Sequence, residues 1–87
     1  MIRLSGENVL RVLTTLTGRQ RWTPRLMTHC SFADPSNGSF FDQGMACYYA
    51  EGRSYTGENV AEIFLHGSPA TVKRFYQVMH DNALARL

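Results

Sequence analysis

The sequence lacks the phosphate loops and long apolar runs by which several large protein classes are recognised. Neither a G-x-x-x-x-G-K-[ST] loop nor a G-x-G-x-x-G segment occurs among its 87 residues, so we expect no GTP or ATP site of either kind. The net charge is only +2, which by itself indicates neither nucleic-acid nor membrane binding. No apolar run approaches the roughly 20 residues that cross a bilayer, and the N-terminus lacks the apolar core of a signal peptide. We therefore expect a cytoplasmic protein with no membrane partner.

Cysteine is also scarce, because Cys30 and Cys47 are the only two. Two cysteines form neither a disulfide framework nor a zinc site of typical spacing. We expect reduced thiols, although two paired strands could bring them together in a bridge, which is rare in the cytosol. His29 adjoins Cys30, and neighbours in a strand point to opposite faces, so they cannot form a local nucleophile–base pair. His66 and His80 have no partners at ligand spacing, and no catalytic or metal-binding residue is predicted.

The distribution of apolar residues and turn formers predicts six elements in the order β-α-β-β-β-α. They are strand 2–4, helix 7–17, strands 25–32, 43–51 and 60–65, and a helix that starts at 69 and ends near 81. Ser5 is the expected N-cap and Gly18 the expected C-cap of the first helix, whereas Ser68 and Pro69 start the second. The turn formers of 34–39 join two strands into a hairpin. The fold class is α+β, a small mixed or antiparallel sheet with two helices over one side.

The chain is long enough for one small domain with a thin core. Apolar content is 44% and charged content 18%, as in globular rather than disordered chains. Each helix contributes an apolar stripe at helical spacing. The stripes are Val9, Val12, Leu13 and Leu16 in the first helix, and Val72, Phe75, Tyr76 and Met79 in the second. So small a core often depends on oligomerisation or on a larger parent protein.

An acidic residue, Glu62, interrupts the otherwise apolar strand 60–65. Side chains alternate between the faces of a strand, so Glu62 shares a face with Val60 and Phe64. A buried carboxylate costs several kcal/mol unless it is paired. One explanation is an ion pair with Arg3, which interrupts another apolar strand. The other is a ligand whose donors face the acid, such as a pterin, whose ring N–H and exocyclic amine match a carboxylate bidentately.

A basic cluster, Arg19, Arg21 and Arg25 with Trp22, follows the first helix. These residues could contact RNA phosphates and stack one base. The alternative is a solvated loop whose Trp22 packs on the core. We favour the alternative, because three arginines carry too little charge for tight autonomous binding.

Four blocks of the sequence together resemble the N-terminal domain of the TrmE/MnmE tRNA modification GTPases. They are Arg3-Leu4-Ser5-Gly6, Asp42-Gln43-Gly44, the run Ser54-Tyr55-Thr56-Gly57-Glu58-Asn59-Val60 through Glu62, and His66-Gly67. Their order and spacing agree over nearly the whole chain, and the run that ends at Glu62 is the most specific.

The resemblance implies a fold similar to the folate-binding part of aminomethyltransferases, with formyl-tetrahydrofolate as cofactor and a constitutive homodimer. By motif, Arg3 and Glu62 correspond to the family's folate-binding arginine and glutamate. In the full-length family a helical domain and a Ras-like GTPase domain follow. With a flavin-dependent partner, the whole protein modifies the wobble uridine of tRNA. The resemblance thus implies an enzyme component without a catalytic centre of its own.

The chain also departs from the family pattern. The family's first strand and its T-P-P-G-R-G-G segment are missing before Arg3, and its Gly-His-Gly-Gly reads Leu65-His66-Gly67-Ser68. We expect residues 1–87 to be a single truncated N-terminal domain without the helical and GTPase domains. An exposed strand edge would favour self-pairing into a homodimer or higher oligomer. The alternative is a small α+β protein-interaction module that has lost ligand binding.

Overall fold

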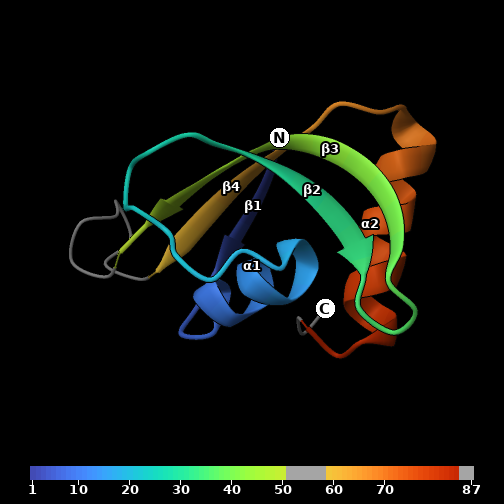
Figure 1. The fold of residues 1–87 in the computed structure, drawn as a ribbon, viewed down its shortest axis with the longest axis horizontal. Helices are drawn as coiled ribbons and strands as arrows, with labels where there is room; N and C mark the ends of the chain where they lie inside the picture. Colours follow the sequence, from blue (N-terminus) through green and yellow to red (C-terminus); the bar gives the residue numbers. More distant parts are fainter. Residues whose placement is uncertain (51–58, 85–87) are drawn as a thin grey trace.

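A computed structural model describes residues 1–50 and 59–84 (Figure 1). Its elements are β1 (Ile2–Ser5), α1 (Val9–Thr17), β2 (Thr28–Asp34), β3 (Ser39–Tyr49), β4 (Val60–Leu65) and α2 (Pro69–Asp81). The predicted order and the α+β class are confirmed. Residues 51–58, which include the predicted end of strand 43–51 and the Ser54–Glu58 part of the motif, lie outside the described residues. No helix in the described ranges is long and apolar enough to cross a membrane.

The four strands form one antiparallel sheet in the order β1-β4-β3-β2. Strand β4 lies between β1 and β3, and its residue Glu62 is the direct partner of Arg3 on one side and of Cys47 on the other. The sheet is therefore purely antiparallel, and in the described chain β1 and β2 form its edges.

The turn between β2 and β3 forms where the density of turn formers predicts it. Asp34 Oδ1 accepts hydrogen bonds from the Ser36 N–H at 2.9 Å and the Ser36 hydroxyl at 2.7 Å. The Gly38 N–H donates to the Asp34 carbonyl at 2.7 Å, and Gly38 has the positive φ of 70° that favours glycine. This closed turn lets β3 begin at Ser39, earlier than the predicted Gln43.

The start of β2 was predicted wrongly. Arg25 has a φ of 68°, which is incompatible with a strand, and the Leu26 N–H donates to the Thr23 carbonyl at 3.2 Å in a turn. The chain therefore becomes extended only at Thr28.

One cap of α1 was predicted correctly and the other was not. Ser5 belongs to β1, opposite Val60, and Asn8 is the N-cap, so the helix begins at Val9. Gly18 ends it as predicted, with a φ of 73° and its N–H donating to the Thr14 carbonyl at 2.8 Å.

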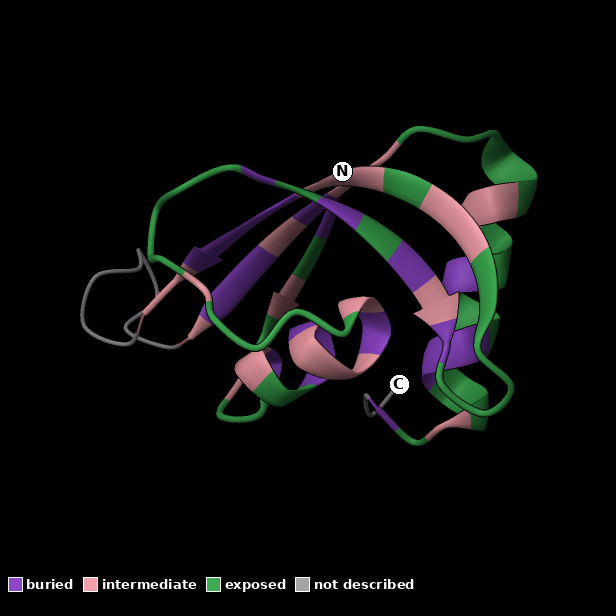
Figure 2. Cartoon of the chain, viewed as in Figure 1, coloured by how far each residue is buried: buried purple, intermediate pink, exposed green. Residues whose placement is uncertain are grey.

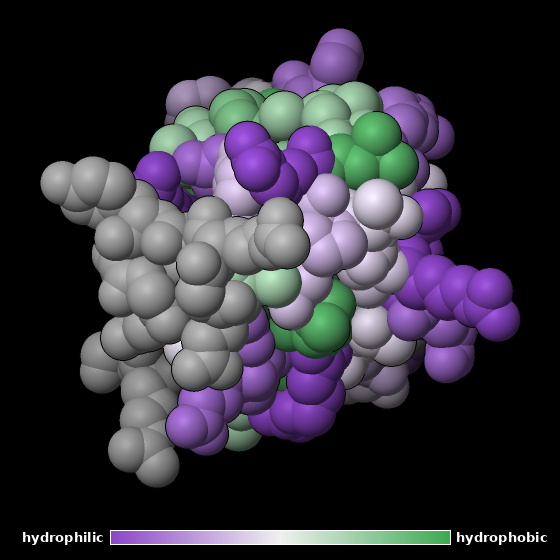
Figure 3. All heavy atoms as spheres, turned by 90° about the vertical axis from the view of Figure 1, so that its left-hand side faces the viewer, coloured by the Kyte–Doolittle hydropathy of each residue, from purple (hydrophilic) through white to green (hydrophobic). Residues whose placement is uncertain are grey.

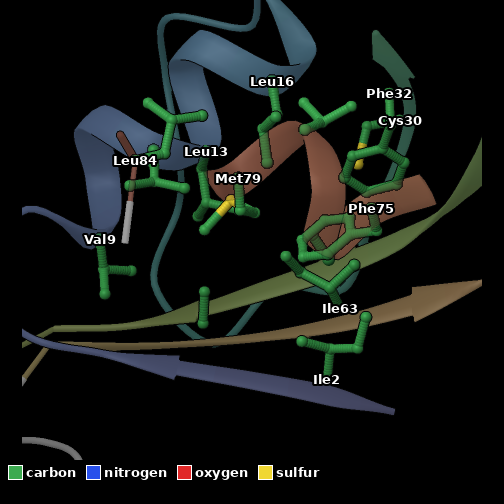
Figure 4. Packing of buried hydrophobic residues seen from close by; sticks show 14 of the residues in the cluster. Ile2, Val9, Leu13, Leu16, Cys30, Phe32, Ile63, Phe75, Met79 and Leu84 are labelled. Carbon is green, nitrogen blue, oxygen red and sulfur yellow. The ribbon is translucent and has the colours of Figure 1, made fainter. Parts of the chain in front are cut away.

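Both helices pack on one face of the sheet (Figure 4). The predicted stripe of α1 is buried throughout. In α2 the buried residues are Phe75, Val78 and Met79, whereas Tyr76 is 46% exposed, so Val78 replaces Tyr76 in the predicted stripe. The Phe75 ring meets the Phe32 ring edge-on at 6.4 Å between centroids, which couples α2 to β2.

The two thiols lie on opposite faces of the sheet. Cys30 joins the core beneath the helices and pairs with Gly44 in the ladder, whereas Cys47 shares the other face with its partner Glu62. Both are free, so the possible bridge is ruled out by geometry. Burial raises the pKa of the Cys30 thiol.

Candidate functional site

The face of the sheet turned away from the helices, called here the outer face, holds the candidate site. The ladder pairing places on it Arg3 and Ser5 of β1, His29 and Ser31 of β2, Gln43, Met45, Cys47 and Tyr49 of β3, and Val60, Glu62 and Phe64 of β4. Cys47 and Val60 are buried although neither belongs to the core cluster. Figure 2 shows buried and half-buried residues along β3 and β4. Apolar side chains of β3 and β4 therefore surround Glu62, whereas the outer-face positions of β1 and β2 are polar.

Among the residues that the structure describes, Glu62 makes two hydrogen bonds on this face. Its Oε2 accepts from Arg3 Nη2 at 2.9 Å in an ion pair, and its Oε1 accepts from the Tyr49 hydroxyl at 3.1 Å. The Glu62 side chain is 17% exposed and that of Arg3 56%. The predicted neighbourhood of Arg3 and Glu62 is thus confirmed, and the ion pair explains how the sheet tolerates the acid. A role of either residue toward a ligand stays a prediction.

The pKa values of the cluster shift in opposite directions. The hydrogen bond from Arg3 holds the pKa of Glu62 below its usual range, and the bond from Tyr49 adds to this. Hydrogen bonding to Cys47 and then to Glu62 raises the pKa of Tyr49 to about 12. At neutral pH the site consequently presents a carboxylate oriented by a guanidinium and by a neutral phenol.

Sequence reasoning did not identify Tyr49 as a member of this cluster. Cys47 is directly opposite Glu62, and Tyr49, two residues further along β3, reaches the carboxylate diagonally. The available signal was its position on the same face of the strand as Cys47. The sequence pattern alone did not show that β3 pairs with β4. Without that pairing, Tyr49 could not be placed beside Glu62.

The motif residues around Asp42 have a structural role. Asp42 Oδ2 accepts the backbone N–H of His66 at 2.9 Å and of Gly67 at 3.0 Å. The His66 N–H also donates to the Gln43 carbonyl at 3.2 Å. A Cβ at Gly44 would collide with the Phe64 carbonyl oxygen across the ladder. Two of the family-like blocks therefore meet here and fix the end of β4.

Two hollows are relevant, one beside the outer face and one beside β1. The first, of about 640 Å³, is lined by the outer-face residues His29, Met45 and Phe64, with parts of β3 and the end of β4. The second, of about 480 Å³, lies between β1 and the two helices and is lined mainly by apolar residues. Neither hollow is lined by Glu62, but Phe64, two residues along the same face, borders the first.

The remaining candidates of the sequence do not form a site. His29 is exposed and Cys30 is buried, as expected of neighbours on opposite faces. Within the described ranges, no three His, Cys, Asp or Glu side chains gather as metal ligands. Trp22 is half-buried and packs against the core cluster, which confirms the favoured interpretation of that residue.

Comparison with known proteins matches the whole chain to one family. The family model described as GTP-binding protein TrmE N-terminus matches residues 1–87. The chain is 43% identical, over all 87 residues, to the tRNA modification GTPase MnmE of Rickettsia canadensis (strain McKiel), of which it covers 18%. It is 40% identical over 87 residues to the protein of that name from Psychrobacter sp. (strain PRwf-1), covering 17% of it.

A third relative, the tRNA modification GTPase MnmE of Parvibaculum lavamentivorans, is 38% identical over 72 residues, which are 83% of this chain and 16% of that protein. The chain thus spans less than a fifth of the length of these relatives. With a matching family model over its full length, the chain belongs to the TrmE N-terminal domain family.

Proposed function

We propose that the chain is the formyl-tetrahydrofolate-binding and homodimerisation domain of a tRNA modification GTPase that acts on the wobble uridine of tRNA. Family membership supports this proposal. The single observation that carries it is the ionised, oriented carboxylate of Glu62 among the apolar outer-face side chains of β3 and β4.

The donor and acceptor count at Glu62 suits a pterin edge. A carboxylate has about four lone-pair sites, and Arg3 and Tyr49 use two of them. Two sites are left for a ring N–H and its neighbouring exocyclic amine, the bidentate pattern that a carboxylate binds well. Because both oxygens are already held, little side-chain freedom would be lost on binding.

The surroundings of Glu62 suit a flat heterocycle. Phe64, two residues along on the same strand face, is half-buried, and apolar surface of this kind accepts a ring. Phe64 borders the hollow of about 640 Å³, a volume within the range of roughly 300–1,000 Å³ that small-molecule sites occupy. In this proposal the pterin edge bonds Glu62, and the rest of the ligand lies over Phe64.

Arg3 is assigned the second contact. Its guanidinium has five N–H donors, one of which bonds Glu62, and the side chain is more than half exposed. Within residues 1–50 and 59–84 its other donors make no side-chain hydrogen bond, and we assign them to a polar group of the ligand. When bound, the folate would supply a one-carbon unit. The folate itself would be bound and oriented by Arg3, Tyr49 and Glu62.

The wider setting belongs to the same proposal. In a full-length protein the domain would be followed by the helical and GTPase domains and would work in the cytoplasm with a flavin-dependent partner. This chain would supply the folate site and the dimer contact, and no GTP turnover.

Isothermal titration calorimetry with formyl-tetrahydrofolate tests the folate site. Glu62→Gln should weaken binding about 10- to 100-fold, because a hydrogen bond to a charged group contributes about 1.5–3 kcal/mol. Glu7→Gln is the matched control, since Glu7 is exposed and makes none of these contacts. This variant should bind formyl-tetrahydrofolate with the affinity of the wild type. Equal affinity for wild type and Glu62→Gln would refute the assignment.

A second function is favoured by the apolar side chains that β3 and β4 carry on the outer face. If the wild-type chain binds no formyl-tetrahydrofolate while folded, this face is better explained as the contact surface of a small α+β protein-interaction module. The same titration therefore separates the two functions.

A further inference from the structure

We infer that Asn37, in the turn between β2 and β3, is a site of spontaneous deamidation, and that the hydrogen bonds of this turn set the rate of the reaction. The inference rests on residues 34–39 and is independent of the proposed folate site. Figure 1 shows the turn on the right of the view, beside the end of α2, far from the side of the molecule that Figure 3 presents. Figure 2 shows the turn as exposed.

The chain contains four asparagines, and only Asn37 precedes a glycine. Each of the other three precedes a residue with a side chain, in the pairs Asn8-Val9, Asn59-Val60 and Asn82-Ala83. Deamidation begins when the backbone nitrogen of the next residue attacks the side-chain carbonyl carbon, and a side chain on that next residue hinders the approach. Gly38 has none, and both Asn37 and Gly38 are exposed. Asn37 is therefore the asparagine that is attacked with least hindrance.

The geometry of the turn requires this pair of residues. Gly38 has a φ of 70°, in the left-handed region that favours glycine. Asn37 Oδ1 accepts the Ser39 N–H at 2.7 Å, the local bond from side chain to backbone by which asparagine favours turns. The features that form the turn thus place a labile amide directly before an unhindered nitrogen.

Hydrogen bonds of the folded turn oppose the reaction. The Gly38 N–H donates to the Asp34 carbonyl at 2.7 Å, so the attacking nitrogen is held by a partner. The side-chain carbonyl of Asn37 is held by Ser39. Asp34 Oδ1 also keeps the turn closed, because it accepts the N–H and the hydroxyl of Ser36 at 2.9 and 2.7 Å. Attack therefore requires the turn to open locally.

The reaction is balanced with water as its only other reactant. The Gly38 nitrogen loses its proton and bonds to the side-chain carbonyl carbon of Asn37, while the side-chain amide group leaves as ammonia. Water then opens the resulting cyclic imide at either of its two carbonyls, and the Gly38 nitrogen recovers a proton. The products carry aspartate or isoaspartate at position 37 and have gained a negative charge.

Isoaspartate at this position affects more than the turn. It routes the main chain through the former side chain, which lengthens the path from Asp34 to Gly38 and breaks their hydrogen bond. Asp34 also connects the turn to α2, because Asn82 Nδ2 donates to its Oδ1 at 3.2 Å and Arg74 Nη2 lies 3.6 Å from its Oδ2. The isoaspartate product should therefore loosen the C-terminal end of α2, whereas aspartate can still accept the Ser39 N–H.

Peptide mapping by mass spectrometry, after incubation of the chain at one fixed pH, measures deamidation at each asparagine. We expect modification at Asn37 before modification at Asn8, Asn59 or Asn82. In the folded chain the rate at Asn37 should be roughly 5- to 100-fold lower than in concentrated urea, since two hydrogen bonds must break first.

Ser36→Ala tests the control of the rate by the turn. The variant removes the hydroxyl bond to Asp34 and should accelerate deamidation of the folded chain roughly 2- to 10-fold, as the loss of one hydrogen bond implies. Its rate in urea should equal that of the wild type. Ser31→Ala is the matched control, since Ser31 is exposed in β2 outside the turn, and it should leave both rates unchanged.

Hydrogen exchange tests the connection to α2. The isoaspartate product, separated by ion exchange, should exchange the amide hydrogens of residues 78–82 several-fold faster than the unmodified chain. Asn37→Asp represents the aspartate product and should exchange them at the unmodified rate.

Three results would overturn the inference. They are equal deamidation at Asn37 and at another asparagine, equal rates at Asn37 in the folded chain and in urea, and equal rates in Ser36→Ala and Ser31→Ala. Unchanged hydrogen exchange in the isoaspartate product would overturn the connection between the turn and α2.

Discussion

Glu62 shows how a single charged residue is accommodated on an apolar strand face. Its two oxygens are bonded by Arg3 and Tyr49, so the desolvation cost of a partly buried carboxylate is offset by direct contacts. Arg3 is more than half exposed, and water screens such a pair. The pair therefore stabilises the fold modestly, and its larger effect is to keep the acid ionised and oriented.

We expect Glu62→Gln to lower the free energy of unfolding at pH 7 by about 1–2 kcal/mol. The pKa of Glu62 is lower in the folded state than in the unfolded state. Its contribution is thus complete above the unfolded value of about 4.3 and is lost as pH falls through the folded value. Urea unfolding of wild type and variant from pH 7 down to about pH 3 should show the two curves converging. A gap that stays constant over this range would contradict the prediction.

Tyr49→Phe tests the second hydrogen bond at the residue scale. Without the phenol, the pKa of Glu62 should rise, because one donor that stabilises the carboxylate is removed. Carbon-13 NMR titration of the carboxyl group measures this pKa directly. Tyr76→Phe is the matched control, since Tyr76 is exposed on α2. This variant should leave the pKa of Glu62 unchanged.

At the scale of elements, the close approach of β3 and β4 depends on one glycine. A Cβ at Gly44 would collide with the Phe64 carbonyl oxygen, which is backbone and cannot move without separating the strands. At the end of α1, a Cβ at Gly18 would meet nothing within 4 Å, and the only cost there is the φ of 73°. The two glycines are thus required for different reasons, one steric and one conformational.

We expect Gly44→Ala to destabilise the chain by about 3 kcal/mol, as overpacking in a closed site does. Gly18→Ala should cost about 1 kcal/mol, the usual penalty of a left-handed conformation. Chemical denaturation of both variants measures the difference. A larger loss for Gly18→Ala would show that β3 and β4 do not approach each other as closely as described.

Local signals predicted most elements, because each depends on a few neighbouring residues. The alternation of 60–65, the turn formers of 34–39, Gly18 and Pro69 all act within one turn or strand. Ser5 failed as a cap because its pairing with Val60 involves a distant strand. Arg25 failed as a strand residue because it adopts a left-handed φ of 68° in a turn, which the residue type does not indicate.

At the scale of the whole molecule, the helices cover one face of the sheet and leave the other to the residues around Glu62. The described sheet also ends in β1, an edge with unpaired backbone groups. A strand edge of this kind favours association with a second copy. This supports the proposed homodimer.

Light scattering of the chain at concentrations on the order of tens of micromolar should give the mass of a dimer or higher oligomer, and dilution should shift it toward the monomer. The outer-face variant Glu62→Gln should be compared with Glu7→Gln, to detect any contribution of the Glu62 cluster to the contact. A monomeric mass for the wild type at that concentration would contradict the proposal.

The sequence by itself determined the α+β class, the order of the elements and the face assignment within 60–65, because these follow from short-range periodicity. It also gave Arg3 as the candidate partner of Glu62, because an unpaired acid in an apolar strand is costly. Only the tertiary structure decided that Tyr49 reaches Glu62, that Val78 rather than Tyr76 enters the core, and that Cys30 and Cys47 lie on opposite faces. The physical reason is that strand register and helix rotation are set by contacts between segments far apart in the chain.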